Sequence, residues 1–144
     1  MNTDEGTVAI RPIKKSDYEA VFRLAWNLIS PEDLALLNIG SPTSLCFVAE
    51  VNGRVVGFNL AHLLHVGIPL NKICVIQGIV VHDDYRRLGI GEKLIEAIFN
   101  NCTSGGISTV RALVEESDLR LQQFVEYLGF QHSTVSNYDK CLVP

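Results

Sequence analysis

The chain has 144 residues, of which 47% are hydrophobic, and a formal net charge of −4 at pH 7. This length suits one compact domain of roughly 100–150 residues, so we expect a single domain over residues 1–144. The acidic balance, without a Lys/Arg stripe, argues against nucleic acid as a partner, and the lack of any apolar run of about 18 residues argues against a membrane span.

The beginning of the chain is expected to form one strand and two short helices. Residues 7–13 alternate apolar and polar side chains, which indicates a strand. Ser16 followed by Glu19 has the spacing of a capping box, so a first helix is expected to begin there. Ser30-Pro31 supplies an N-cap residue and a first-turn proline for a second helix.

The next segment is expected to form an antiparallel hairpin and then a buried strand. Asn52-Gly53 is typical of a two-residue hairpin turn, and it separates the apolar segments 45–51 and 54–65. Residues 73–81 are β-branched and nearly uncharged, which favours a strand buried on both faces. A glycine inside that strand, Gly78, fits either a β-bulge or a close packing contact.

The second half of the chain is expected to alternate helices and strands. In chain order we expect a helix after Gly91, a strand over residues 108–114, a helix capped by Ser117 or Asp118, and two short terminal strands over residues 130–135 and 140–143. The whole order predicts a mixed α/β domain with a central sheet of seven strands and four helices. The strand–helix–strand unit around Gly89 should be a right-handed parallel crossover.

The segment Arg86-Arg87-Leu88-Gly89-Ile90-Gly91 joins the buried strand to the helix that follows it. Glycine adopts backbone angles closed to other residues, so successive N–H groups can converge on one anion there. The first-turn N–H groups and the positive dipole end of the helix add to this attraction. The pattern predicts a phosphate site, with an ordinary glycine-rich turn as the alternative. Dinucleotide binding is disfavoured, because Gly-x-Gly-x-x-Gly spacing is missing.

This segment resembles the Arg/Gln-x-x-Gly-x-Gly/Ala signature of the GNAT superfamily of acyl-CoA-dependent N-acyltransferases. Val81-His82-Asp83-Asp84-Tyr85 resembles the strand exit that precedes the signature, and Leu128-Gly129-Phe130 is similar to a later helix-to-strand corner of that family. The resemblance implies a GNAT-like fold in which the fourth and fifth strands splay apart. It also implies acetyl-CoA as co-substrate, with its pantetheine arm lying along the fourth strand.

The resemblance assigns the cofactor-binding positions residue by residue. Backbone groups of the fourth strand would bind the pantetheine arm, the glycine turn and its arginines would hold the pyrophosphate, and one residue takes the position of the usual asparagine of the final helix. These positions are Ile79, Val80, Val81, Arg86, Arg87, Leu88, Gly89, Ile90, Gly91 and Asp118. A strand N–H near Val81 would face the thioester carbonyl, where negative charge grows during attack.

The catalytic candidates follow from position and chemistry. A base would remove a proton from the incoming amine, and an acid would protonate the thiolate that leaves. Glu115, Glu116 and His82 are the candidate bases and Tyr138 is the candidate acid. His62 and His65 are weaker candidates for the base, and Gln77 could hold a bridging water. For each of them a solvated or packing role is the alternative.

One position departs from the family pattern. Many relatives place a sulfur-protonating tyrosine where this chain has Val125, and valine cannot donate a proton. Tyr127 stands about 200° further round the helix and should face away from the cofactor side. The departure motivates a second hypothesis, a GNAT-like module that binds acyl-CoA without turnover. A third hypothesis is a structural domain that keeps only the scaffold.

The leading hypothesis is an acetyl-CoA-dependent N-acetyltransferase that acts by direct attack in a ternary complex, without a cysteine acyl-enzyme. The acceptor would be a small-molecule amine or a peptide amine, entering beside the first two helices. Polar and aromatic residues that cluster there are Trp26, Asn27, Glu32, Asp33 and Asn38. The resemblance also allows a homodimer, because terminal strands in such folds often meet in dimers.

Cysteine and histidine spacing argues against a metal site. Neither Cys-x-x-Cys nor His-x-x-x-His spacing occurs, so no protein-bound metal is expected, and the cysteines are expected to be reduced packing residues. The four cysteines are Cys46, Cys74, Cys102 and Cys141. The first six residues are polar and acidic, unlike a signal peptide, and we expect a cytoplasmic protein.

Overall fold

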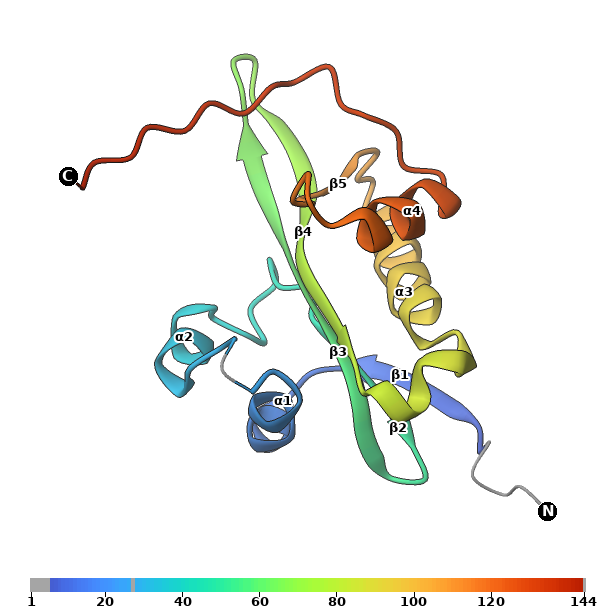
Figure 1. The fold of residues 1–144 in the computed structure, drawn as a ribbon. Coiled ribbons are helices and arrows are strands. Elements are labelled where there is room, and N and C mark those ends of the chain that lie inside the picture. Colours follow the sequence, from blue (N-terminus) through green and yellow to red (C-terminus); the bar gives the residue numbers. More distant parts are fainter. Residues whose placement is uncertain (1–5, 27, 144) are drawn as a thin grey trace. The chain divides into compact units, whose positions relative to one another are not determined.

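The fold was analysed in a computed structural model that describes residues 6–26 and 28–143 (Figure 1). The chain divides into two compact units, Met1–Leu113 and Val114–Pro144. The first unit contains the sheet and most of the helices, and the second contains one helix and the C-terminal segment. The expectation of a single domain stays a prediction.

The first unit is built on a five-stranded sheet whose strand order follows the chain, β1-β2-β3-β4-β5. Its strands are β1 (Val8–Pro12), β2 (Phe47–Val51), β3 (Arg54–Val66), β4 (Asn71–Val81) and β5 (Val110–Ala112). The first four strands pair antiparallel, and β4 pairs parallel with β5. The mixed sheet and the parallel crossover from β4 to β5 confirm the predicted α/β class.

The hairpin between β2 and β3 is confirmed at the predicted turn. Asn52 has φ 52° and Gly53 has φ 77°, so both residues are left-handed, as a two-residue turn of the mirror-image type requires. Val51 and Arg54 face each other across this turn. The turn therefore sets the register in which β2 and β3 begin to pair.

Helices of the first unit lie on both faces of the sheet. They are α1 (Tyr18–Leu24), α2 (Pro31–Leu36) and α3 (Ile90–Ser104), with 3-10 turns η1 (Lys15–Asp17) and η2 (Asp83–Leu88). The second unit contains α4 (Leu119–Tyr127). Figure 1 shows α1 and α2 on one side of the sheet and α3 on the other. Among the described residues, no helix is long and apolar enough to cross a membrane.

The two helix starts predicted in the first unit have different outcomes. Ser30 caps α2 as predicted, since its Oγ accepts from the Asp33 N–H at 3.1 Å and its own N–H donates to the Asp33 carboxylate at 3.0 Å. The capping box predicted at Ser16 and Glu19 is wrong. The 3-10 turn η1 precedes α1 in place of the predicted cap. Asp17 lies in this turn, and its carboxylate accepts a hydrogen bond from Arg11.

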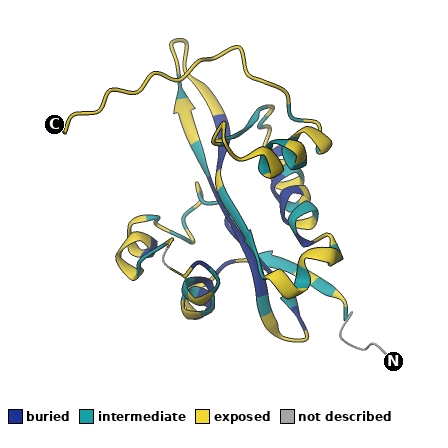
Figure 2. Cartoon of the chain, in the orientation of Figure 1, coloured by how far each residue is buried: buried dark blue, intermediate teal, exposed yellow. Residues whose placement is uncertain are grey.

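The core consists of one apolar layer on each face of the sheet (Figure 2). On the side of α1 and α2, Val21 and Leu34 are buried with Phe58 of β3 in one cluster. On the other side, α3 turns a stripe of buried residues toward the strands. This stripe is Ile90, Leu94, Ile95, Ile98 and Cys102. Burying each such side chain contributes roughly 1.5–3 kcal/mol, so α3 is fixed firmly to the sheet.

A partly buried charge cluster ties β1 to the start of α1. Asp17 is only 5% exposed, and its two carboxylate oxygens accept hydrogen bonds from Arg11, each at 2.7 Å. The Lys14 N–H donates to the same carboxylate at 2.9 Å, and Arg11 also pairs with Glu50 of β2. The hydrogen bonds from Arg11 lower the pKa of Asp17, and the hydrogen bond with Asp17 raises the pKa of Arg11.

The second unit departs from the predicted strand count. Its helix begins as predicted, with the Asp118 carboxylate accepting from the Leu121 N–H at 3.1 Å. The two terminal strands predicted over residues 130–135 and 140–143 are wrong, so the sheet has five strands rather than seven. Alternation predicts an extended backbone, but a strand also needs a neighbour, and residues 131–143 are exposed and form no ladder within the described chain.

The Arg11–Asp17 pair gives a pH-dependent test of stability. Asp17→Asn should lower the free energy of unfolding at pH 7 by about 2 kcal/mol, because hydrogen bonds to charged groups contribute about 1.5–3 kcal/mol. The folded-state pKa of Asp17 is depressed, so its contribution is present above the unfolded-state pKa of about 3.9 and is lost as the pH falls through the folded-state value.

Urea unfolding of wild type and variant at neutral and acidic pH measures this contribution. The difference between the two proteins should shrink on acidification, and an equal difference at both pH values would contradict the role of the ion pair. Glu19→Gln is the matched control, because the Glu19–Arg23 pair is exposed and contributes only about 0.5 kcal/mol or less.

Candidate functional site

The candidate site begins where β4 loses its parallel neighbour. β5 pairs with β4 only at Cys74, Val75 and Ile76, and the Leu113 N–H donates to the Ile76 carbonyl at 3.3 Å. Beyond Ile76, residues 78–81 of β4 pair with β3 on one side only within the first unit. This is the splay expected between the fourth and fifth strands.

Backbone groups of Ile79 and Val81 point into this splay. The His82 N–H donates to the Val56 carbonyl of β3 at 2.8 Å. Because backbone groups alternate in direction along a strand, Val80 also directs its N–H and C=O toward β3. Ile79 and Val81 therefore direct theirs to the opposite side, where no strand of the first unit pairs with them.

A β-bulge produces this orientation. The register of β3 and β4 shifts so that Leu60 faces Gly78 and Ala61 faces Ile76, leaving Gln77 as the extra residue. The structure thus has a bulge at the position expected for Gly78. Before the bulge, the Cys74 N–H points toward β5, where it donates to the Thr109 carbonyl at 3.1 Å. The extra residue reverses the alternation, so odd-numbered residues face that side afterwards.

The start of α3 offers a second set of free N–H groups. Gly89 has φ 68° and ψ 25°, and this left-handed residue ends η2 and begins α3. The first hydrogen bond of α3 runs from the Lys93 N–H to the Gly89 carbonyl at 3.0 Å, and α3 has no side-chain cap. The N–H groups of Ile90, Gly91 and Glu92 thus point out of the helix end.

The sequence pattern missed one of these amides. It placed the helix after Gly91 and so assigned the anion to the amides of residues 88–91. The helix starts two residues earlier, at Ile90, so its free first-turn amides are those of Ile90, Gly91 and Glu92. A strict count of first-turn amides from Gly89 as the cap would have included the Glu92 N–H.

The cationic side chains of the turn differ in their surroundings. Arg86 forms an ion pair with Asp83 at 2.9 Å inside η2, while Arg87 is exposed. Leu88 is half-buried at the end of the same turn. Charge from Arg87 is therefore accessible to an anion at the helix start, whereas Arg86 would have to exchange its partner.

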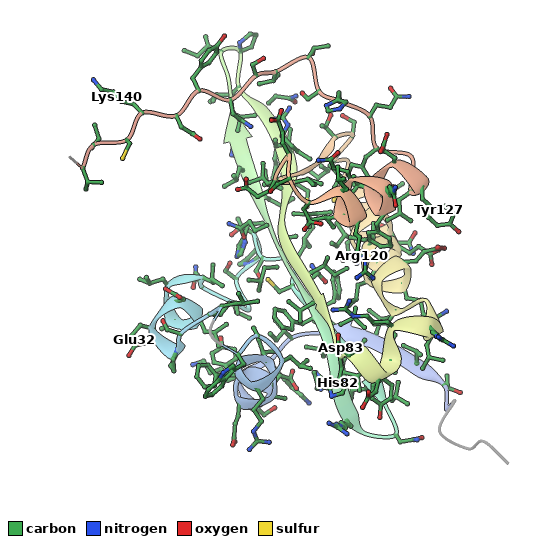
Figure 3. The ribbon with its side chains drawn as sticks, in the orientation of Figure 1. Glu32, His82, Asp83, Arg120, Tyr127 and Lys140 are labelled. Atoms are coloured by element: carbon green, nitrogen blue, oxygen red, sulfur yellow. The ribbon has the colours of Figure 1, made fainter. Side chains whose placement is uncertain are left out.

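His82 connects β4 to η2, and Figure 3 shows it beside its neighbour Asp83. Its Nδ1 accepts a hydrogen bond from the Asp84 N–H at 3.1 Å, and its ring packs edge-on against Tyr85 at 5.5 Å. Because Nδ1 is an acceptor here, the proton of the neutral ring lies on Nε2. The lone pair that a base would use is engaged within η2.

The structure brings together two side chains that the sequence offered only as separate, weaker candidates. His62 Nδ1 lies 2.7 Å from Gln77 Oε1, and His62 Nε2 lies 3.0 Å from the Leu37 carbonyl at the end of α2. Nothing in the sequence signalled this contact. It depends on the pairing of β3 with β4 and on the position of α2, since Val75, the ladder partner of His62, lies two residues before Gln77.

The remaining catalytic candidates belong to the second unit. Glu115 is exposed, and its carbonyl accepts from the Asp118 N–H at 3.0 Å. Asp118 itself caps α4, and Tyr138 is 94% exposed. Val125 is half-buried whereas Tyr127 is 74% exposed, in keeping with their predicted separation round the helix. The catalytic roles of Glu115 and Tyr138 stay predictions.

The residues expected to face the acceptor lie mostly at the surface. Trp26 is 67% exposed and packs edge-on against Phe22, with 6.3 Å between ring centroids. Glu32 is exposed on α2, and Asn38 has φ 48° after that helix. Asp33 serves α2 as part of its cap. Asn27 lies outside the described residues.

The cysteines are free thiols. Cys46, Cys74 and Cys102 are buried and Cys141 is exposed. Burial raises the pKa of all three interior thiols, that of Cys74 to about 12, which leaves them protonated and poorly nucleophilic near neutral pH. Over the part of the chain that the structure describes, no three His, Cys, Asp or Glu side chains cluster to hold a metal ion.

Comparison with known proteins identifies the family. The sequence matches the acetyltransferase (GNAT) family over residues 8–130, which includes the whole sheet and α4. The chain belongs to the GNAT family. Membership supports acyl transfer in general and is consistent with the splay and the glycine turn described above.

Individual relatives of this GNAT chain are distant. It is 21% identical over 126 residues to an uncharacterised N-acetyltransferase of Bacillus subtilis (strain 168), YhfO, covering 88% of this chain and 84% of that protein. Two solved structures share its fold. The aminoglycoside N-acetyltransferase AAC(6')-Iy in complex with CoA matches with a TM-score of 0.82 and 20% identity, over 95% of this chain and 96% of that one.

The second structure is a ribosomal-protein-alanine N-acetyltransferase from Brucella melitensis biovar Abortus 2308. It matches with a TM-score of 0.77 and 20% identity, covering 95% of this chain and all of that one. At these identities the likeness shows the fold. The two neighbours are named for different acceptors, so the fold leaves the acceptor of this GNAT protein open.

The conformation of Gly89 provides a stability test for the turn. A Cβ at Gly89 would contact no atom within 4 Å, but its φ of 68° is unfavourable for alanine by roughly 1–2 kcal/mol. Gly89→Ala should therefore lower the free energy of unfolding by about that amount, measured by urea denaturation. Gly78→Ala is the control, because the added Cβ also meets open space and no left-handed φ is involved. Equal effects of the two substitutions would contradict the analysis.

Proposed function

We propose that this protein transfers an acetyl group from acetyl-CoA to a primary amine by direct attack in a ternary complex. The observation that carries the proposal is a pair of outward-facing sets of backbone groups, joined through η2. One set belongs to Ile79 and Val81 at the splayed edge of β4, and the other consists of the first-turn amides of α3. A strand edge and a helix start placed in this way match a ligand with an extended, amide-bearing arm and a phosphate group.

The residues present fit coenzyme A. The N–H groups of Ile90, Gly91 and Glu92 would bind the pyrophosphate, because a helix start favours anions and Gly89 carries no side chain that could cover it. Arg87 would add positive charge beside them. The backbone of Ile79 and Val81 would bind the pantetheine arm as a missing strand would. When bound, the thioester supplies an activated acetyl group.

The same edge offers electrostatic help for the reaction. An outward N–H of Ile79 or Val81 can donate to a carbonyl oxygen that gains negative charge as an amine attacks. Orientation of two bound reactants lowers the barrier further. Burial and raised pKa values of Cys46, Cys74 and Cys102 argue against a cysteine acyl-enzyme at these positions, which supports direct attack.

The base and the acid are proposed mainly from residue type and position in the sequence. His82 lies directly after Val81, but it must release the Asp84 N–H before Nδ1 can accept a proton from an amine. Glu115 and Tyr138 are kept as the other candidates. A primary amine is proposed as the acceptor class because the names of both structural neighbours specify an N-acetyltransferase.

Coenzyme A binding tests the phosphate site. Gly91→Glu would place a negative side chain beside the proposed pyrophosphate site, so its affinity for coenzyme A should fall roughly tenfold or more, a loss of about 1.4 kcal/mol per decade. Asn100→Glu adds the same charge on the exposed face of α3 away from its start, and it should bind like wild type. Isothermal titration measures all three proteins.

Unchanged affinity in Gly91→Glu, with a folded protein by circular dichroism, would remove the assignment of the phosphate site. Gly89→Glu tests the same site, although its affinity must be compared with that of Gly89→Ala, which isolates the effect of backbone strain.

Turnover separates the enzyme from a binding module. With acetyl-CoA and a panel containing an aminoglycoside, spermidine, lysine and a peptide with N-terminal alanine, the enzyme should release free thiol with at least one amine, followed by a thiol-reactive dye. Binding of coenzyme A without thiol release from any amine would favour the acyl-CoA-binding module, which Val125 in place of the family tyrosine motivates.

A further inference from the structure

The contact between His62 and Gln77 is a polar contact whose hydrogen bonding depends on which ring nitrogens of His62 carry protons. His62 is half-buried on β3, and each of its ring nitrogens lies within hydrogen-bond distance of an oxygen atom. One is the Leu37 carbonyl at 3.0 Å, and the other is Gln77 Oε1 at 2.7 Å. Both oxygens can only accept hydrogen bonds.

Hydrogen-bond accounting gives this arrangement two states. A backbone carbonyl cannot donate, so the contact with Leu37 requires a proton on Nε2 in either state. With Oε1 of Gln77 facing Nδ1, that nitrogen must carry a proton too, and the ring is an imidazolium. When the ring is neutral, Nδ1 has a lone pair, and the Gln77 amide must turn over to present its NH2 group.

The turn of the amide changes what Gln77 presents to its surroundings. Gln77 is exposed at the bulge, two residues before Ile79. With neutral His62 the amide carbonyl faces outward and accepts hydrogen bonds. With protonated His62 the amide NH2 faces outward and donates them. An ammonium group has N–H donors and no acceptor, so it is bound by the first state and repelled by the second.

Other charged side chains around His62 do not explain the turn of the Gln77 amide. On β3 and β4 the titratable residues nearby in sequence are His65, Lys72 and Cys74, and by alternation all three lie on the opposite face. From α2, Glu32 and Asp33 lie in the first turn, away from the Leu37 end. On α1, Glu19 and Arg23 pair with each other, and the neighbouring loop contributes Ser44.

We infer that Gln77 is the acceptor-binding residue of the proposed acetyl transfer and that His62 is the positioning residue that sets which amide atom it presents. The inference rests on the proposed function, since it places the acceptor amine beside the bulge next to the outward N–H of Ile79. It predicts that protonation of His62 weakens amine binding without displacing the coenzyme.

Nitrogen-15 NMR of the full-length protein tests the two states without any turnover. Below its titration midpoint, His62 should carry protons on both ring nitrogens, and above it only on Nε2. The Gln77 side-chain NH2 signals should move with the same midpoint. They should not move in His62→Phe, whereas His132→Gln, a change in the exposed C-terminal segment, should leave the transition intact. A neutral ring protonated on Nδ1 would overturn the inference, as would Gln77 signals that ignore the titration.

Because His62→Phe could perturb the fold, a second test keeps the wild-type protein and changes the added ligand. Methylammonium, a minimal amine, should shift the residue 77 side-chain and Ile79 backbone signals of wild type when His62 is neutral, and the shift should be lost on its protonation. Tetramethylammonium, which has no N–H donor, should cause no shift in either state. A methylammonium response that is absent, or equal in both states, would overturn the inference.

Gln77→Glu distinguishes amide orientation from simple charge repulsion. A carboxylate presents only acceptors, so in this variant the methylammonium response should persist in both protonation states of His62. If the response is still lost on protonation, repulsion by the imidazolium is the cause and the role of the amide is wrong. These spectra need no acetyl transfer, so they are read separately from coenzyme A titration, which tests the proposed function itself.

Discussion

One extra residue in β4 determines the rest of the candidate site. Because Gln77 bulges out of the ladder with β3, the backbone alternation reverses halfway along the strand. Before the bulge, the backbone groups of β4 that point away from β3 pair with β5. After the bulge, the backbone groups of Ile79 and Val81 point to that same side, but β5 no longer pairs with β4 there. A regular strand of the same sequence would have turned the backbone groups of Gly78 and Val80 outward instead.

The bulge and the helix start complement each other. The edge of β4 leads through His82 and η2 directly into the first turn of α3, and Gly89 makes the change of direction without a side chain. The apolar stripe of α3 holds that first turn against the sheet, since Ile90 itself is buried. Free amides at the strand edge and at the helix end are thus held on one rigid frame, which is what a long ligand with two distinct binding groups requires.

Local chemistry made much of this fold predictable. Asn52-Gly53, Ser30-Pro31 and Asp118 each work through their immediate neighbours, so the hairpin and two helix starts were correct. The Ser16 cap failed because Arg11 of β1, six residues before Asp17, engages the Asp17 carboxylate instead.

Interactions between distant segments account for the remaining differences. The terminal strands were wrong because an alternating sequence specifies an extended backbone but not a partner. The glycine signature located the turn, whereas the His62–Gln77 contact requires the register of two strands and the end of α2, which no local pattern encodes.

The part of the site assigned to the coenzyme consists almost wholly of peptide groups. Every residue except proline carries an amide N–H, so side chains along 79–81 and 90–92 can drift in evolution while the ligand-facing surface stays the same. This gives a physical reason why proteins about one-fifth identical to this chain keep the same architecture. On the proposed assignment, side chains lining the amine side can change to take new acceptors without rebuilding the half proposed to bind the coenzyme.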